Sequence, residues 1–222
     1  MKIKFLFTVL FIGLLMSMVE DKKTRIVFFG DSITQAGVKP GGYIQLMQQM
    51  LKAKKLEDKY ELIGAGIGGN KIYDLYLRME EDVLAKKPDV VVIWVGVNDV
   101  WHKASYGTGT DADKFERFYK AVVKKLQDNN IKVYLTTPST IGEKTDNSNQ
   151  QDGDLNHYSN IIRKIAAENN CGLIDLRKEF LAYNMKNNPS NKESGILTTD
   201  RVHLNEAGNK FVAEKMSVLI KN

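Results

Sequence analysis

The sequence predicts an α/β protein with a single three-layer α/β/α domain built on a five-stranded parallel sheet. Short runs rich in β-branched residues alternate with longer amphipathic runs, which is the pattern of consecutive βαβ units. The run PDVVVIWVG at residues 88–96 is apolar on both faces, as a central strand covered by helices must be. The chain has 222 residues, 43% of them hydrophobic, so one sizeable core is expected.

The expected elements follow one another along the chain. Apolar, β-branched runs predict five strands, near residues 25–29, 60–64, 89–95, 131–136 and 172–175. Amphipathic runs predict helices near residues 43–54, 71–86, 113–129, 155–169, 177–185 and 205–220. The doubly apolar third strand is expected in the middle of the sheet.

Four stretches rich in small or polar residues occupy connections between expected strands and helices. Three of them, GDSIT, GAGIGGN and GVNDVW, follow expected strands, and the fourth, DRVHLN, precedes the last expected helix. Ligands of an open parallel sheet bind outside the carboxyl ends of its strands. We therefore expect the four stretches to face one crevice.

The first and last stretches contain the residue types that acyl transfer needs. Ser32 is a candidate nucleophile and His203 a candidate base, and one tight turn can bring the carboxylate of Asp200 to the imidazole. Plainer interpretations stay open for each residue. Asp31 or Ser32 is also favoured as a helix cap, and Asp200 with His203 also fits a turn followed by a helix start.

The middle stretches contain candidate donors for an oxyanion. The backbone N–H groups of Ser32 and Gly69 and the side-chain amide of Asn98 are suited to this role. A glycine lets the backbone approach the reacting carbonyl closely. A glycine-rich turn and an Asn-Asp turn are the alternatives, and both are common.

In order and spacing the four stretches resemble the blocks of the SGNH hydrolases, also called the GDSL esterase/lipase family. The blocks read FFGDSIT, GIGGN, GVNDV and DRVHLNEAG here, from the first expected strand to the last expected helix. The resemblance implies the SGNH/flavodoxin-like fold and a serine esterase that works through an acyl-enzyme. It makes Ser32 the nucleophile and Asp200 with His203 the rest of the triad. Gly69 and Asn98 then complete the oxyanion hole.

Two details bear on this resemblance. Ile33 stands where the family has Leu, which is a conservative change. Of the adjacent Gly68 and Gly69, Gly69 fits better, because the family's glycine directly precedes an Asp or Asn, here Asn70. The blocks look most similar to the branch that holds the platelet-activating-factor acetylhydrolase subunits and related carbohydrate esterases.

Further candidate substrate contacts lie beside the blocks. They are Asp31, Tyr43 and Trp101, although an aromatic residue at a helix start, such as Tyr43, usually packs in the core. His102 is either a pocket residue beside Trp101 or a solvated loop residue.

The loops expected to rim the site are polar and contain no apolar lid. They are residues 102–113, 139–154 and 184–200. This composition favours a short acyl group, acetyl foremost, on a polar alcohol such as a sugar. A lysophospholipase or thioesterase of the same family is the alternative.

Three other interpretations compete with this resemblance. Gly64, Gly66 and Gly69 form G-x-G-x-x-G, but a dinucleotide fingerprint needs an acid about 20 residues on at a strand end, where Asp89 instead begins its strand. An ordinary α/β-hydrolase needs G-x-S-x-G, whereas Thr34 takes the second glycine position. A non-catalytic binding module on this fold predicts a broken triad, and none of its positions is lost.

The beginning of the chain predicts a signal peptide or an N-terminal anchor over residues 1–19, followed by the SGNH hydrolase domain over 20–222. Lys2 and Lys4 precede the apolar run FLFTVLFIGLLMSMV, which is short for a membrane span. We therefore expect a secreted, periplasmic or envelope protein with no stable membrane span after processing.

Charge and cysteine usage narrow the expected partners. The net charge of +5 is spread in mixed-sign runs, so no nucleic-acid partner is expected. The single Cys171 excludes an internal disulfide, and the three histidines are scattered, so neither a metal nor another cofactor is expected. The expected partner is a small-molecule or glycan ester.

Overall fold

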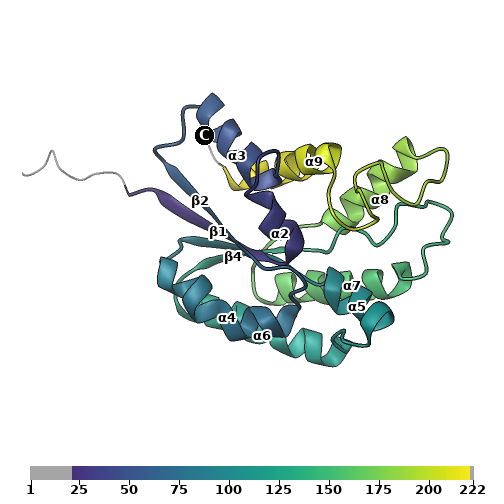
Figure 1. The fold of residues 1–222 in the computed structure, drawn as a ribbon. Helices are drawn as coiled ribbons and strands as arrows, with labels where there is room; N and C mark the ends of the chain where they lie inside the picture. The colour runs from purple at the N-terminus through teal and green to yellow at the C-terminus, as the bar shows by residue number, and fades with distance from the viewer. Residues whose placement is uncertain (1–21, 221–222) are drawn as a thin grey trace, which may run out of the picture.

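A five-stranded parallel sheet with the strand order β2-β1-β3-β4-β5 forms the centre of the protein (Figure 1). The structure is a computed structural model, and it describes residues 22–220. The strands are β1 (Thr24–Gly30), β2 (Tyr60–Gly66), β3 (Val90–Trp94), β4 (Lys132–Thr136) and β5 (Gly172–Ile174). Every expected strand is present, and the expected central strand is β3. The signal peptide or anchor predicted for residues 1–19 lies outside the described residues.

Helices cover both faces of the sheet, so the predicted three-layer α/β/α architecture is confirmed (Figure 1). One face carries α4 (Ile72–Asp82), α5 (Val97–Tyr106), α6 (Ala112–Asp128) and α7 (Asp152–Glu168). The other carries α2 (Ser32–Gly37), α3 (Tyr43–Ala53), α8 (Leu176–Asn187) and α9 (Glu206–Met216).

Two expected helices end earlier than the sequence predicts. The helix expected over 71–86 stops at Asp82, because Val83 leaves the helical backbone angles with φ −126° and ψ −63°. A 3₁₀ turn, η1 (Leu84–Lys86), continues the chain. The last helix likewise ends at Met216 and continues as η2 (Ser217–Leu219).

The sequence does not predict α5, which begins almost directly after β3. Gly96, at φ 127°, turns the chain from strand to helix without a connecting loop. The polar residues Asn98 and Asp99 face inward and are buried, so they interrupt the apolar stripe by which a helix is recognised. This short connection brings the GVNDV block to the edge of the sheet.

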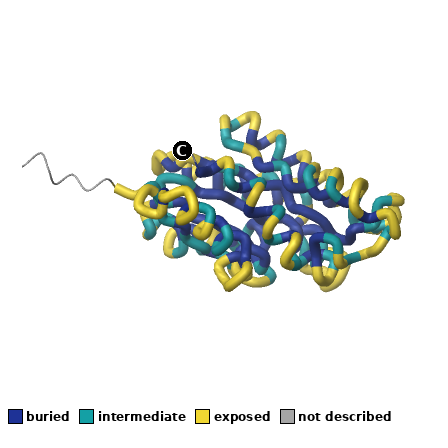
Figure 2. The backbone as a smooth tube through the Cα atoms, turned by 90° about the horizontal axis from the view of Figure 1, so that it is seen from above, coloured by how far each residue is buried: buried dark blue, intermediate teal, exposed yellow. Residues whose placement is uncertain are grey.

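The helix α6 shows how the amphipathic runs build the core. Its buried side chains recur at helical spacing: Phe115, Tyr119, Val122, Val123 and Leu126. Each large apolar side chain that is buried contributes about 1.5–3 kcal/mol relative to leaving it exposed. Figure 2 shows the result, with the strands dark blue between helices whose outer turns are yellow.

Three general features of the described residues bear on function. Between residues 22 and 220, no helix is both long enough and apolar enough to cross a bilayer. In the same range, no three His, Cys, Asp or Glu side chains lie close enough together to share a metal ion. Cys171 is a free, half-buried thiol, and burial raises its pKa to about 11, so it is a poor nucleophile at neutral pH.

Candidate active site

Ser32 lies at the turn from β1 to α2, at the carboxyl edge of the sheet. Gly30 has no room for a side chain, because a Cβ there would lie 2.4 Å from the carbonyl oxygen of Trp94. Asp31 is the N-cap of α2, and its Oδ1 accepts a hydrogen bond from the N–H of Ile33 at 3.0 Å. The capping interpretation thus holds for Asp31 and leaves the Ser32 hydroxyl available for chemistry.

Ser32, His203 and Asp200 form a continuous hydrogen-bonded chain. Ser32 Oγ lies 2.9 Å from His203 Nε2, and His203 Nδ1 lies 2.7 Å from Asp200 Oδ2. Partial burial alone would raise the pKa of Asp200, but hydrogen bonds from the ring and backbone N–H of His203 hold it below its ordinary value. The carboxylate is therefore ionised at neutral pH and can orient the imidazole, as a nucleophile, base and acid triad requires.

The segment that carries the triad acid and base is held by its own backbone. The N–H of Thr199 donates to the carbonyl oxygen of His203 at 2.8 Å, and Thr198 and Leu204 form an antiparallel bridge. Asp200 Oδ1 accepts from the N–H of His203 at 2.8 Å. This tight turn explains why the three-residue spacing in DRVH brings the two side chains together.

Glu143, which the sequence does not single out, anchors the same segment by hydrogen bonds to its backbone. It is fully buried, and its carboxylate accepts the backbone N–H groups of Ile196, Leu197 and Thr198 at 2.8, 2.6 and 2.9 Å. A buried carboxylate is stable only when such donors satisfy it. Glu143 therefore positions the chain immediately before Asp200.

The two adjacent glycines of the GIGGN block differ in what their N–H groups contact. The N–H of Gly68 donates to Gln35 Oε1 at 3.1 Å. Gly69 has φ 76°, and no acceptor is within hydrogen-bonding distance of its N–H among residues 22–220. The N–H of Ser32, at the first position of α2, has no acceptor within its helix. Gly69 rather than Gly68 thus has a free donor, in keeping with the choice made from the sequence.

Asn98 is placed beside the GIGGN block by α5. It is 2% exposed, and its Nδ2 donates one hydrogen bond to the carbonyl oxygen of Asn70 at 3.1 Å. A side-chain amide nitrogen has two N–H groups, so the second is available to a reacting oxygen. The structure therefore brings the GIGGN and GVNDV blocks together, as predicted.

Arg78 links the elements that carry the candidate oxyanion donors. Its guanidinium donates to the carbonyl oxygens of Gly30 at 2.7 Å and Ala65 at 3.0 Å, and to Asn70 Oδ1 at 2.7 Å. It also stacks over the ring of Phe29, 4.6 Å from the ring centroid. Only an arginine fork can reach these acceptors at once, so Arg78 fixes the end of β1 against the block after β2.

The structure corrects two of the predicted substrate contacts. Tyr43 is fully buried, packs edge-on against Phe28 and Trp94, and shares a hydrogen bond of 3.2 Å with Thr34, so it is a core residue. Asp31 is 2% exposed and cannot contact a substrate directly; burial raises its pKa to about 7.

Trp101 and His102 lie along the rim of the site. The Trp101 ring centroid is 6.2 Å from that of His203, and the His102 ring lies 5.6 Å from Trp101 and 5.0 Å from Tyr106. His102 Cε1 is 3.9 Å from where a Cβ on Gly69 would stand. His102 is therefore a half-buried helical residue rather than a solvated loop residue. Contact between Trp101 and a substrate stays a prediction.

Comparison with known protein families agrees with the geometry of this site. A model of the GDSL-like lipase/acylhydrolase family matches residues 28–211, which include all four blocks. The chain belongs to this family. The predicted family resemblance is confirmed, and the protein is a carboxylic ester hydrolase.

Similar proteins include two acetylxylan esterases. The acetylxylan esterase of Geobacillus stearothermophilus is 30% identical over 207 residues, which cover 85% of this chain and 90% of that protein. The crystal structure of an acetyl xylan esterase, AlAXEase, has a TM-score of 0.88 and 74% identity, covering 89% of this chain and 100% of that one. Platelet-activating factor acetylhydrolase IB subunit alpha1 of Homo sapiens is 33% identical over 91 residues, 40% of this chain and 35% of that protein.

In this esterase, the G-x-G-x-x-G pattern serves packing. A Cβ on Gly64 would lie 2.3 Å from Val38 Cγ1, and one on Gly66 would lie 2.1 Å from the backbone nitrogen of Gln35. These two glycines let β2 lie close against α2 and against Val38, which directly follows α2. Close packing therefore accounts for these two glycines.

Proposed function

We propose that this esterase removes acetyl groups from xylan or from xylo-oligosaccharides. The proposal rests on one observation: an intact Ser-His-Asp constellation in a chain that is similar over nearly its whole described length to acetylxylan esterases. The polar segments on either side of the triad, which offer hydroxyl and amide groups rather than a long apolar groove, support a short acyl group on a sugar.

Acylation begins when Ser32 Oγ attacks the acetyl carbonyl carbon. The proton of the hydroxyl passes to His203 Nε2, and Asp200 stabilises the imidazolium that forms. Negative charge develops on the carbonyl oxygen, which accepts from the N–H of Ser32, the N–H of Gly69 and the amide of Asn98. His203 then donates its proton to the sugar oxygen as the C–O bond breaks, which leaves an acetyl-enzyme.

Deacylation repeats the same proton transfers with water. His203 Nε2 takes a proton from a water molecule as its oxygen attacks the acetyl carbon, and the same donors stabilise the second oxyanion. Ser32 leaves with the proton from His203, and acetate is released. Besides the substrate and one water molecule, the steps described use side chains and backbone groups of this chain.

We also propose that the enzyme acts outside the cytoplasm. The two lysines and the apolar run at the start of the sequence support export, and a polymeric substrate would be met outside the cell. N-terminal mass spectrometry of the protein recovered from culture medium and from envelope fractions tests this proposal. An intact N-terminus in the cytoplasmic fraction alone would contradict it.

The test of function compares acyl chain lengths and sugar substrates. The protein lacking residues 1–19 is assayed on p-nitrophenyl esters from acetate to decanoate and on acetylated xylo-oligosaccharides, beside Ser32→Ala. Ser190→Ala, which changes an exposed serine, is the matched control. We expect activity on acetate and on the sugars that disappears only with Ser32→Ala. A preference for long chains would instead favour a lysophospholipase, and activity confined to acyl thioesters would favour a thioesterase.

A further inference from the structure

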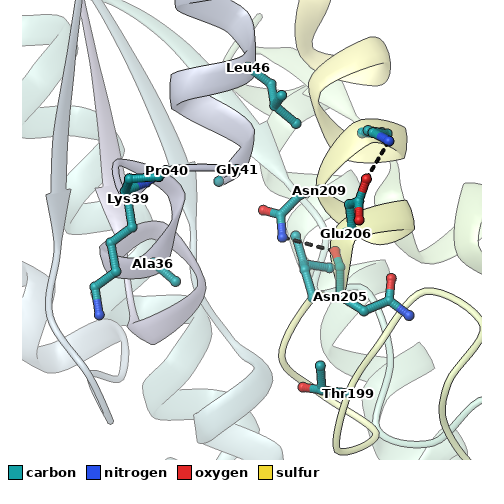
Figure 3. A pocket seen from close by; sticks show the side chains of 12 residues that line it. Ala36, Lys39, Pro40, Gly41, Leu46, Thr199, Asn205, Glu206 and Asn209 are labelled. Atoms are coloured by element: carbon teal, nitrogen blue, oxygen red, sulfur yellow. Dashed lines mark hydrogen bonds and ion pairs between the residues drawn. The ribbon is translucent and has the colours of Figure 1, made fainter.

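A pocket of about 590 Å³ opens between the connection from α2 to α3 and the beginning of α9 (Figure 3). Ala36, Lys39 and Pro40 line one wall, and Thr199 and Glu206 line the other. Its volume lies within the range of about 300–1,000 Å³ typical of small-molecule sites. None of the candidate site residues predicted from the sequence lines it.

The pocket is preformed, because hydrogen bonds join its two walls. The backbone N–H of Tyr43, at the start of α3, donates to Asn209 Oδ1 on α9 at 2.9 Å. Asn209 Nδ2 in turn donates to the carbonyl oxygen of Asn205 at 2.9 Å. A ligand therefore meets a shape that is already set and orders little of the chain on binding.

The pocket adjoins the triad on the side of His203. Ala36 follows Ser32 by four residues in α2, so the two lie on one helix face with their Cβ atoms about 6 Å apart. Thr199 directly precedes Asp200, and Leu204, another lining residue, directly follows His203. The lining is thus continuous in the chain with all three triad residues.

Proton transfer determines which part of an ester points this way. His203 Nε2 must reach the oxygen of the departing alcohol, whereas the carbonyl oxygen must face Gly69 and Asn98. Gly69 stands on the connection after β2 and Asn98 in the first turn of α5, whereas the pocket lies between the start of α3 and the start of α9. The alcohol portion of the substrate therefore extends from His203 toward the pocket.

The lining has the mixed chemistry that a sugar ring requires. Ala36, Leu46 and Leu204 supply apolar surface for the C–H faces of a pyranose. Lys39 on one wall supplies an ammonium donor. On the other wall Glu206 Oε1 is paired with Lys210 Nζ at 2.6 Å, which leaves Oε2 as an acceptor for the sugar hydroxyls (Figure 3). A fatty acyl chain would remove water from Lys39 and from the Lys210–Glu206 ion pair without replacing the lost hydrogen bonds, so it is a poor occupant.

We propose that this pocket binds the saccharide chain that carries the acetyl group, as the subsite for the departing alcohol. The inference rests on the proposed deacetylation of xylo-oligosaccharides and deepens it. It assigns recognition of the glycan to Lys39 and Glu206, on the two facing walls of the pocket. A small ester such as p-nitrophenyl acetate has no glycan to place there.

The test compares one ratio between variants: kcat/KM for an acetylated xylo-oligosaccharide divided by kcat/KM for p-nitrophenyl acetate. We expect the double variant Lys39→Ala/Glu206→Ala to lower this ratio about tenfold, because each lost hydrogen bond contributes a factor of a few. The ratio removes any general effect on the triad. Lys52→Ala/Glu57→Ala makes the same change of charge at exposed positions outside the pocket and should leave the ratio unchanged.

Chain length supplies the second measurement. In the wild type, KM should fall as xylose units are added to the acetylated sugar, and the double variant should flatten this dependence. An unchanged ratio together with an unchanged length dependence would overturn the pocket assignment while leaving the proposed function intact. If the wild type hydrolyses p-nitrophenyl acetate through Ser32 but no acetylated xylo-oligosaccharide, the proposed function fails and this inference fails with it.

Discussion

Replacing Glu143 by glutamine should destabilise the protein and misplace its triad. The carboxylate accepts three backbone N–H groups, from Ile196, Leu197 and Thr198, in a fully buried position. In Glu143→Gln, one of the two oxygens becomes an NH₂ group that faces a backbone N–H, so at least one of these bonds is lost. The two other bonds change from charge-assisted to neutral.

The magnitude follows from these bonds. A hydrogen bond to a charged group contributes about 1.5–3 kcal/mol, and a neutral one about 0.5–1.5 kcal/mol. Part of the loss is offset, because the glutamine avoids the cost of burying a charge. We expect the free energy of unfolding to fall by about 2–4 kcal/mol. We also expect kcat to fall about tenfold or more, since a small displacement of catalytic groups is costly.

Urea unfolding followed by circular dichroism, and kcat for p-nitrophenyl acetate without urea, measure the two effects. Glu193→Gln is the control on the same segment, because Glu193 forms an exposed ion pair with Arg201 at 2.6 Å, worth less than about 1 kcal/mol. A Glu143→Gln protein that loses less than about 0.5 kcal/mol, within the range of ordinary surface changes, would refute the anchoring role.

Three further predictions concern the triad, the oxyanion hole and a buried acid. Asn98→Ala should lower kcat on p-nitrophenyl acetate about 100- to 1000-fold with little change in KM, and a change confined to KM would contradict its role as a donor. Asp200→Asn should lower kcat by about 10⁴, because the imidazole loses its orienting acceptor; an activity within about tenfold of the wild type would exclude the triad geometry. Burial raises the pKa of Asp99 to about 7. Between the unfolded pKa of about 3.9 and about 7, the folded protein holds a proton that the unfolded chain has lost. The free energy of unfolding therefore falls with rising pH in this range, by up to about 1.4 kcal/mol per pH unit. Asp99→Asn does not titrate, so its stability relative to the wild type should increase between about pH 5 and pH 7 in urea unfolding, and a constant difference would contradict the buried charge.

Much of the fold could be predicted because the apolar pattern of each segment matches its place in the folded protein. Each strand is a short apolar run, and the doubly apolar run at β3 occupies the middle of the sheet as expected. Helix ends were less predictable, because no feature of the local apolar pattern marks Val83, where the helical backbone angles end. The helix α5 escaped prediction because Asn98 and Asp99 point into the protein, where polar residues are uncommon.

The sequence by itself determined the order of strands and helices along the chain, the central place of the third strand, and the residues of the candidate triad and oxyanion hole. It could do so because the four blocks resemble those of the SGNH hydrolases in order and spacing, and because the ends of parallel strands meet at one edge. Ser32, Gly69, Asn98, Asp200 and His203 could therefore be named without coordinates.

Only the tertiary structure decided which neighbours support these residues. Glu143 and Arg78 act on backbone groups that are distant in the chain, so no local pattern identifies them. Burial separated Tyr43 from the substrate contacts, because a helix start looks the same in sequence whether its aromatic residue faces the core or the solvent. The pocket beside His203 arises where α2, α3 and α9 meet, and such a cavity exists only once the helices have packed.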